Sequence, residues 1–200
     1  MFTGIVRGIG RIVHVDSGSE ACRLAIETGR LATGDWRIGD SVAVAGVCLT
    51  IVALADGRFD ADLSGETLHR TTLGRLGAGS PVNLEPAVAA ADLLSGHLVT
   101  GHVDGIVRVR QVAESSGSLR ATIEAPPELV RYIAGKGSVA LDGVSLTIGD
   151  VSGAAFGVDI VPHTLAVTTL GTLAAGQSLN LEVDLIARYL ERLLEARGIR

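Results

Sequence analysis

The chain has 200 residues, 47% of them hydrophobic and 3% aromatic, which is enough apolar material for one or two domains with mainly aliphatic cores. Its net charge is −5, from 17 basic and 22 acidic residues, and no basic stripe is interleaved with aromatic residues, so we expect no nucleic acid as a partner. The longest nearly apolar run, residues 42–55, is too short to span a membrane, and the first ten residues lack the layout of a signal peptide.

Strands are predicted throughout residues 1–90 by aliphatic runs that alternate with Gly, Ser and Asp turn residues. The runs cover residues 4–15, 41–54, 58–63 and 80–88. Between the last two runs, the threonine-rich stretch 66–76 predicts a short helical turn. The Ala-rich stretch 85–97 that follows predicts a short, exposed linker.

The second half of the chain repeats the first half. Residues 3–88 align without a gap on residues 100–185, and roughly 33 of about 86 paired positions are identical. GVCLTI at 46–51 returns as GVSLTI at 143–148, with a serine in place of the cysteine. The chain is therefore two copies of one domain, produced by duplication, followed by a tail.

Each copy has the strand density of a small closed barrel, because closure removes the exposed edges of a short-stranded sheet. The helical turn of the first copy recurs at 163–173, and a further helical piece is predicted at 125–135, where prolines open the segment and glycine ends it. We predict an all-β fold of two tandem six-stranded Greek-key β-barrels, covering 1–90 and 97–184, with a C-terminal α-helix.

The tail, residues 183–200, differs in kind from the barrels. Its apolar residues recur at three- and four-residue steps, which predicts an amphipathic helix with 185–200 as its own unit; they are Leu185, Ile186, Tyr189, Leu190, Leu193 and Leu194. Such a helix can pack on its own barrel or join copies of the chain. Because it lies outside the duplicated unit, neither barrel needs it for its core, and we favour a role in oligomerisation.

The two cysteines, Cys22 and Cys48, form neither a CxxC pair nor a zinc-binding spacing. No metal-ligand spacing and no phosphate-binding glycine loop is found elsewhere. We therefore expect a cytoplasmic protein with reduced thiols.

Polar residues that differ between the two copies are the first candidates for chemistry. Most titratable groups at such positions belong to the second copy, and the pairs are Cys48/Ser145, Ile5/His102, Gly39/Lys136, Ala45/Asp142 and Glu66/His163. Each residue alone is consistent with an ordinary surface role. Together they indicate a functional site that uses the two copies unequally.

Several motifs, in this order and spacing, resemble riboflavin synthase, the trimeric family built from two barrels. They are MFTGIV at the start, GVCLT at 46–50, GHLVTGHVDG at 96–105, KGSVALDGVSLT at 136–147, PHTL at 162–165 and the closing NLEVDLIARYLERLL. The resemblance covers essentially the whole chain. The duplication makes it more specific than any one motif.

The resemblance implies an enzyme that needs no cofactor or metal and moves a four-carbon unit between two molecules of 6,7-dimethyl-8-ribityllumazine. The products would be riboflavin and 5-amino-6-ribitylaminouracil. One lumazine would be attacked at C7, and the other would lose a proton from its acidic C7 methyl group. It also implies a homotrimer gathered by the C-terminal helices, with each site between the N-terminal barrel of one subunit and the C-terminal barrel of the next.

Carried over by motif, the substrate-binding residues form one set in each barrel. For the N-terminal barrel they are Gly4, Ile5, Val6, Cys48, Leu49, Thr50, Asp62, Leu63, Ser64, Gly65, Glu66 and Thr67. For the C-terminal barrel they are Gly101, His102, Val103, Lys136, Ser145, Leu146, Thr147, Val161, Pro162, His163, Thr164, Leu165 and Ala166.

Four of these residues are the catalytic candidates. Cys48 and Ser145 are candidates to deliver or stabilise a nucleophile at C7, although a free cysteine is also a common small buried hydrophobe. His102 is the candidate base at neutral pH, and the hydroxyl group of Thr147 is a candidate to anchor the anion.

Two positions depart from the family pattern, which often has Asn at position 45 and Arg at position 86, where this chain has Ala45 and Pro86. The same double barrel also occurs in monomeric antenna proteins that bind lumazine or flavin without catalysis and have lost active-site side chains, typically in the second copy. Because this chain keeps the second-copy polar residues and the tail, the enzyme is favoured over such a binding protein.

Overall fold

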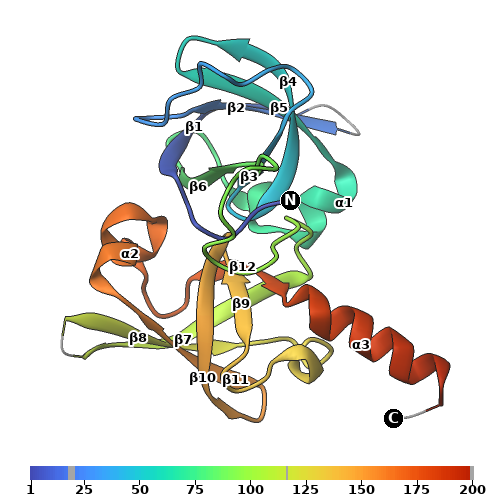
Figure 1. Ribbon diagram of the computed structural model, residues 1–200. Helices are drawn as coiled ribbons and strands as arrows, with labels where there is room; N and C mark the ends of the chain where they lie inside the picture. Colours follow the sequence, from blue (N-terminus) through green and yellow to red (C-terminus); the bar gives the residue numbers. More distant parts are fainter. Residues whose placement is uncertain (18–20, 116, 199–200) are drawn as a thin grey trace.

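Two closed antiparallel barrels and a C-terminal helix make up the computed structural model, which describes residues 1–17, 21–115 and 117–198 (Figure 1). In the N-terminal barrel the strands follow the order β1-β2-β5-β4-β3-β6 and close between β6 and β1. These strands are β1 (Gly8–Ser17), β2 (Ala21–Glu27), β3 (Ser41–Val44), β4 (Val47–Ala55), β5 (Arg58–Ser64) and β6 (Pro81–Pro86).

The C-terminal barrel repeats this topology and closes in the same way. Its strands are β7 (Gly105–Ser115), β8 (Ser118–Glu124), β9 (Ser138–Leu141), β10 (Val144–Ser152), β11 (Ala155–Ile160) and β12 (Ser178–Val183). The predicted fold class, two six-stranded barrels with a C-terminal helix, is confirmed. Of the strands, only β2 and its pairing with β5 were not among the runs predicted for the first copy.

The two threonine-rich turns form short helices at matching places in the two barrels. The first comprises α1 (Gly65–Arg70) and the 3₁₀ turn Thr72–Arg75, and the second comprises α2 (Pro162–Val167) and the 3₁₀ turn Thr169–Thr172. The helical piece predicted at 125–135 is wrong in extent, because only Val130–Tyr132 forms a 3₁₀ turn. There, consecutive i→i−3 bonds replace an α-helix, and burial of Leu129 and Ile133 in the barrel core fixes the turn.

Each barrel encloses its own aliphatic core around one fully buried phenylalanine, Phe59 in the first and Phe156 in the second. Inward residues alternate with outward ones along the strands, as on β4, where the pattern of burial has period two over its first five residues. Since aromatic residues are few, Val, Ile and Leu supply most of the buried area.

The N-terminal and C-terminal barrels are joined by an exchange of backbone segments. The carbonyl of Gly4 accepts a hydrogen bond from the Ser145 N–H at 2.8 Å, and the carbonyl of Gly101 accepts one from the Cys48 N–H at 2.9 Å. Both glycines have positive φ, +75° and +79°. We call residues 3–6 and 100–103 the leader segments, because each precedes one barrel and contacts the other.

Buried glutamates hold the leader segments in place. Glu85 accepts hydrogen bonds from the N–H and hydroxyl of Thr3 and from the Gly4 N–H, at 2.7–3.0 Å. Glu182 makes the same three bonds to the second leader segment, at 2.7–2.9 Å. Burial raises the pKa of Glu85, while the hydrogen bonds from Thr3 and Gly4 oppose that shift.

Two asparagines cross the junction between the barrels. The amide group of Asn83 bonds to the carbonyl of Asp142 and to the N–H of Thr169. The Asn180 amide makes the reciprocal bonds to the carbonyl of Ala45 and to the N–H of Thr72. Both asparagines are about 1% exposed, so these bonds satisfy polar groups that would otherwise be costly to bury.

The two β-hairpin turns that meet at this junction have different sequences. Ala45–Gly46 and Asp142–Gly143 have positive φ at both positions, as two-residue hairpin turns require. Asp-Gly suits this geometry, whereas Ala-Gly places an alanine in the left-handed region at a cost of about 1–2 kcal/mol. Asp142, predicted as part of the functional asymmetry, is therefore a turn residue; its carboxyl group accepts a hydrogen bond from the Asn180 N–H at 2.7 Å.

The C-terminal helix α3 (Leu185–Ala196) extends away from the C-terminal barrel (Figure 1). The predicted tail helix also included residues 199–200, which lie outside the described residues. Within the described part of the chain, no helix is long and apolar enough to cross a membrane.

We predict that Gly101→Ala is far more disruptive than the same change at Gly57. A Cβ at position 101 would lie 2.6 Å from the Cβ of Cys48, whereas Gly57 has comparable φ and open space around it. Backbone strain alone should cost about 1–2 kcal/mol in Gly57→Ala, and steric overlap should raise the loss in Gly101→Ala by a further 1–3 kcal/mol, roughly. Urea denaturation measures both, and equal losses would contradict the tight contact.

We also predict that Asp142→Asn increases stability at alkaline pH. Desolvation raises the pKa of Asp142 from 3.8 to about 7, so the folded state holds a proton that the unfolded state has lost. The free energy of unfolding must then fall as pH rises between these values. The free energy of unfolding of the variant, relative to that of the native chain, should therefore increase by up to about 4 kcal/mol between pH 4 and pH 8. A difference in stability independent of pH would count against this.

Candidate functional site

Three of the four candidate catalytic residues, Cys48, Ser145 and Thr147, lie on the outer walls of the barrels, and His102 belongs to the second leader segment. On β4, Leu49 points inward while Cys48 is partly exposed and Thr50 exposed. On β10, Ser145 is partly exposed and Thr147 is exposed, as are Cys48 and Thr50 at the same positions of the first copy. The interior of each barrel is filled by its hydrophobic core, so any chemistry of these side chains takes place outside it.

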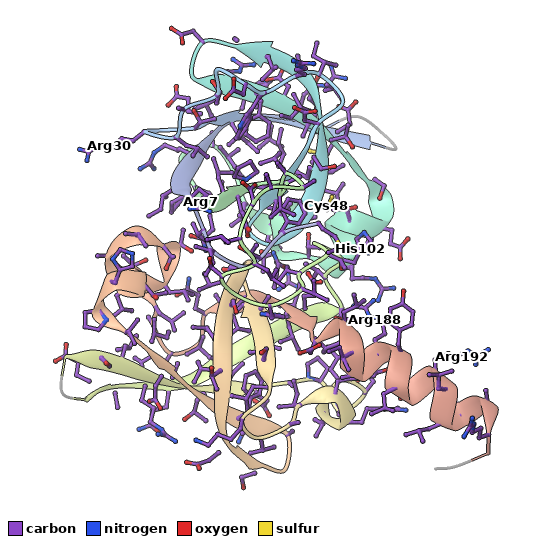
Figure 2. All side chains as sticks on the ribbon, viewed as in Figure 1. Arg7, Arg30, Cys48, His102, Arg188 and Arg192 are labelled. Atoms are coloured by element: carbon purple, nitrogen blue, oxygen red, sulfur yellow. The ribbon has the colours of Figure 1, made fainter. Side chains whose placement is uncertain are left out.

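A pocket of about 330 Å³ lies against the outer wall of the N-terminal barrel. We call it the N-terminal site. Its lining comes from β4, from α1 and its C-cap, and from the second leader segment, and consists of Val47, Cys48, Glu66, Thr67, Arg70, Thr71, Gly101, His102 and Val103. Figure 2 shows Cys48 and His102 near each other at the junction of the barrels. Val47, Arg70 and Thr71 were not predicted, because the set carried over by motif for this barrel does not include them. Arg70 has Val167 as its counterpart in the second copy, so the polar difference between the copies could have pointed to it.

The predicted assignment of the leader segments to the barrels is wrong. Gly101, His102 and Val103 were expected in the C-terminal barrel, but Val103 is buried in the core of the N-terminal barrel. Conversely, Val6 packs against the core of the C-terminal barrel, and Gly4 contacts Ser145. The exchange of segments is the physical reason. Alignment of the two repeats pairs residues by descent and carries no signal for which barrel a segment contacts.

The helix α1 is fixed at its start by a side-chain cap. The hydroxyl of Ser64 accepts the Thr67 N–H at 3.2 Å, which satisfies one of the free donors at a helix start. Asp62, a predicted substrate-binding residue, forms a two-bond ion pair with Arg23 at 2.6 and 2.9 Å. The hydrogen bond from Arg23 lowers the pKa of Asp62. Asp62 does not line the pocket and is already occupied by this partner.

Arg188 connects the C-terminal helix to the N-terminal site. Its guanidinium forms an ion pair with Asp104 at 3.0 Å and donates to the carbonyl of His102 at 3.4 Å. Figure 2 shows Arg188 at the start of α3, close to His102. Burial raises the pKa of Asp104, opposed by the Val183 N–H and by the charge of Arg188. The position of the second leader segment therefore depends on α3.

The corresponding wall of the C-terminal barrel, which we call the C-terminal site, combines Ser145 and Thr147 with the first leader segment and α2. Val161 precedes α2 without a side-chain cap, and Pro162 occupies the first turn, where a missing N–H costs little. Leu165 packs on the barrel core, whereas Val161, Pro162, His163 and Ala166 are exposed and Thr164 is partly exposed.

His97 is a residue of the C-terminal site that sequence reasoning missed. Its Nδ1 lies 2.7 Å from the Ser145 Oγ, in hydrogen-bond contact. The stretch 85–97 was predicted to be an exposed linker, and this is wrong for its ends, because Glu85 is buried and His97 half-buried. His97 lies within the GHLVTGHVDG motif but outside the aligned residues 3–88 and 100–185. It therefore has no counterpart in the other copy with which it could be compared.

Other predicted residues are placed where their side chains serve the fold. Leu49, Leu63 and Leu146 are buried in the barrel cores and offer a ligand only backbone groups. Lys136 is exposed in the turn before β9, with positive φ, and its N–H donates to the carbonyl of Ile148. Among the residues that the structure describes, no group of three or more His, Cys, Asp or Glu side chains could hold a metal ion.

Comparison with known proteins identifies the repeated unit. The lumazine binding domain family matches residues 3–87 and again residues 100–184. A riboflavin synthase from Mycobacterium bovis is 44% identical over 202 residues, covering 99% of this chain and all of that protein. A riboflavin synthase from Actinobacillus pleuropneumoniae is 41% identical over 194 residues, covering 97% of this chain and 90% of that protein.

Solved structures give the same fold. LumP complexed with 6,7-dimethyl-8-(1'-D-ribityl) lumazine aligns with a TM-score of 0.83 at 26% identity, covering 92% of this chain and 99% of that chain. LumP complexed with riboflavin aligns with a TM-score of 0.83 at 28% identity over the same shares. Since the relatives match at more than 40% identity over nearly their full length, the chain belongs to the riboflavin synthase family of enzymes and carries two lumazine-binding domains.

Proposed function

We propose that the protein is a riboflavin synthase that converts two molecules of 6,7-dimethyl-8-ribityllumazine into riboflavin and 5-amino-6-ribitylaminouracil. The observation that carries the proposal is the pair of related outer walls, each with a polar β-strand residue beside the leader segment of the other barrel. One substrate molecule binds each wall. Relatives named riboflavin synthase support the reaction, and the LumP complexes support lumazine and riboflavin as ligands.

The size of the N-terminal site favours one substrate molecule per wall. A pocket of about 330 Å³ is at the lower end of the range of small-molecule sites, about 300–1,000 Å³. Two lumazines must therefore be brought together by two walls. Clamping two flat rings face to face makes a bimolecular step effectively intramolecular, which can supply about 7–11 kcal/mol of the barrier reduction.

Cys48 is the candidate at the N-terminal site to deliver or orient a nucleophile at C7 of its lumazine. It is partly exposed, and the same pocket wall carries His102. The second wall binds the lumazine that loses a proton from its C7 methyl group. Thr147 lies on the same outer face of β10 as Ser145 and is the candidate to hold the resulting anion.

Oligomerisation would bring the two kinds of wall together. The helix α3 is attached to its own barrel through polar contacts: Glu191 with Arg131 and Tyr132, and Arg188 with Asp104. Five of its large apolar side chains are 37–68% exposed, and they are Ile186, Tyr189, Leu190, Leu193 and Leu194. An exposed apolar stripe of this kind marks an interaction surface. We propose a homotrimer joined by this stripe, with each active site between the N-terminal site of one subunit and the C-terminal site of its neighbour.

A second candidate function is binding of lumazine or flavin without catalysis. It is favoured by one observation, the likeness of the fold to LumP complexes with lumazine, riboflavin and flavin mononucleotide. The two functions make opposite predictions about turnover.

We expect the purified chain, given 6,7-dimethyl-8-ribityllumazine alone, to produce riboflavin, followed by absorbance and fluorescence. Cys48→Ala should lower kcat/KM by about 10²-fold or more. Cys22→Ala, which removes the other thiol of the same barrel, should keep most of the activity. Tight binding of lumazine with no turnover would reject the enzyme and leave the binding protein.

Charged substitutions on α3 should separate the subunits. Leu190→Arg combined with Leu193→Arg should give monomers by light scattering, with unchanged circular dichroism and much lower activity. Arg192→Ala, on the same helix, should remain oligomeric. Fully active monomers would refute a site shared between subunits, and deletion of residues 186–200 offers the same test without new charges.

A further inference from the structure

The two leader segments are followed by the same backbone contact but by different side chains. The Arg7 N–H donates to the carbonyl of Leu84 at 2.9 Å, and the Asp104 N–H donates to the carbonyl of Leu181 at 2.8 Å. Arg7 and Asp104 are counterparts in the two copies. Among the described residues, Arg7 forms no ion pair, whereas Asp104 is paired with Arg188 of α3. Because α3 lies outside the duplicated unit, this contact exists only in the second half of the chain.

Arg188, Asp104 and the carbonyl of His102 form a compact group that we call the clamp. One nitrogen of the Arg188 guanidinium, Nη2, lies 3.0 Å from the Asp104 carboxylate and donates to the His102 carbonyl at 3.4 Å. The same carboxylate oxygen accepts a hydrogen bond from the Val183 N–H at 2.8 Å, just before α3 begins. The side chains of Arg188 and Asp104 are 36% and 15% exposed, so water and salt screen this pair less than an ion pair on the open surface.

The clamp acts on the exposed residue of the second leader segment. Gly101 is held by backbone and carboxylate hydrogen bonds, and Val103 is buried in the core of the N-terminal barrel. His102, between them, is exposed, and Arg188 is the one described residue that donates to its carbonyl. Its counterpart in the first leader segment is Ile5, whose carbonyl accepts no hydrogen bond from any described residue. The clamp therefore acts on the N-terminal site alone.

Packing alone does not account for an arginine at this position. Its Nε is buried and has no hydrogen-bond partner among the described residues, and a buried donor without a partner is unfavourable. Lysine lacks this group and carries its charge on a single nitrogen with three hydrogens to donate. Since Nη2 supplies both bonds of the clamp, a lysine at position 188 should preserve the clamp, whereas a neutral side chain of similar length should abolish it.

We propose that Arg188 is a positioning residue of the N-terminal site, which holds the second leader segment against β4 and so keeps His102 beside Cys48. Gly101 lies so close to Cys48 that an added Cβ would be 2.6 Å from the cysteine Cβ, so the segment covers part of this side chain. Without the clamp, the segment moves more freely, the thiol becomes more accessible and His102 is less well placed. The effect on turnover rests on the proposed function, whereas the effect on access to Cys48 does not.

The direct test is the rate at which iodoacetamide alkylates the two cysteines, followed by mass spectrometry of the peptides that contain them. In Arg188→Met, Cys48 should react about tenfold faster than in the native chain, since local opening no longer breaks a hydrogen bond to a charged group. Cys22 is buried in the core of the N-terminal barrel and should react as slowly as before, because the barrel stays folded. Arg192→Ala, which removes an exposed arginine of α3, should match the native chain within about twofold.

Two further variants separate positioning from a general loss of stability. Arg188→Lys should restore the native rate of Cys48 alkylation. Arg188→Met combined with Asp104→Asn leaves no unpaired buried carboxylate, so it guards against misfolding of the single variant. This double variant should be alkylated no faster than Arg188→Met, because residues joined in one contact are not additive.

Turnover of lumazine gives the second readout. Arg188→Met should lower kcat by about tenfold with little change in KM, as loss of a positioning contact does, while light scattering shows an unchanged oligomeric state. Deletion of residues 186–200 removes the clamp together with the apolar stripe, whereas Arg188→Met removes the clamp alone.

Four results would overturn the clamp: unchanged alkylation of Cys48 in Arg188→Met, equal acceleration of both cysteines, a lysine variant that behaves like the methionine variant, or an unchanged kcat in an active enzyme. A native chain that neither binds nor converts lumazine, with the expected alkylation pattern, would instead overturn the proposed function and leave the clamp standing.

Discussion

The exchange of leader segments between the barrels is the constraint on which the rest of the structure depends. A backbone carbonyl of each leader segment accepts a hydrogen bond from the outer wall of the other barrel, so the segment must approach a strand more closely than a side chain allows. Glycine with positive φ meets that requirement at Gly4 and Gly101. The buried glutamates, Glu85 and Glu182, then fix each segment by three hydrogen bonds. These contacts determine the shape of both sites, because each site is lined by one leader segment.

The duplication and the barrels could be predicted from the sequence, because repeats and alternation are local signals. What could not be predicted depends on contacts between distant segments. The alignment paired His102 with Ile5 correctly but could not say that His102 faces Cys48. The alignment also gave no information on His97, which has no counterpart among the aligned residues. The prolines at 126–127 suggested a helix start, yet burial of Leu129 and Ile133 decided the local geometry.

Differences between the copies proved to be of two kinds. Asp142 differs from Ala45 because both stand in a strained hairpin turn, where Asp is the better residue. Ser145 differs from Cys48 at the surface of two sites, and only Ser145 has a histidine hydrogen-bonded to its side chain among the described residues. A polar difference between twins is therefore informative only once its place is known. At a turn it reports backbone conformation, and on an outer wall it reports chemistry.

The crossed leader segments also bear on how such a chain could arise. A single copy contains both halves of this contact. The first copy, for example, has a leader segment with Gly4 and an outer wall with Cys48 that binds the other leader segment. Two identical single copies can therefore satisfy each other about a two-fold axis, which is the geometry of an isologous dimer. Fusing two such copies into one chain keeps every junction contact and removes the requirement that both halves be identical. The tandem barrel thus corresponds to a dimer whose two subunits are covalently linked. The residues of the N-terminal and C-terminal sites could then change independently of each other.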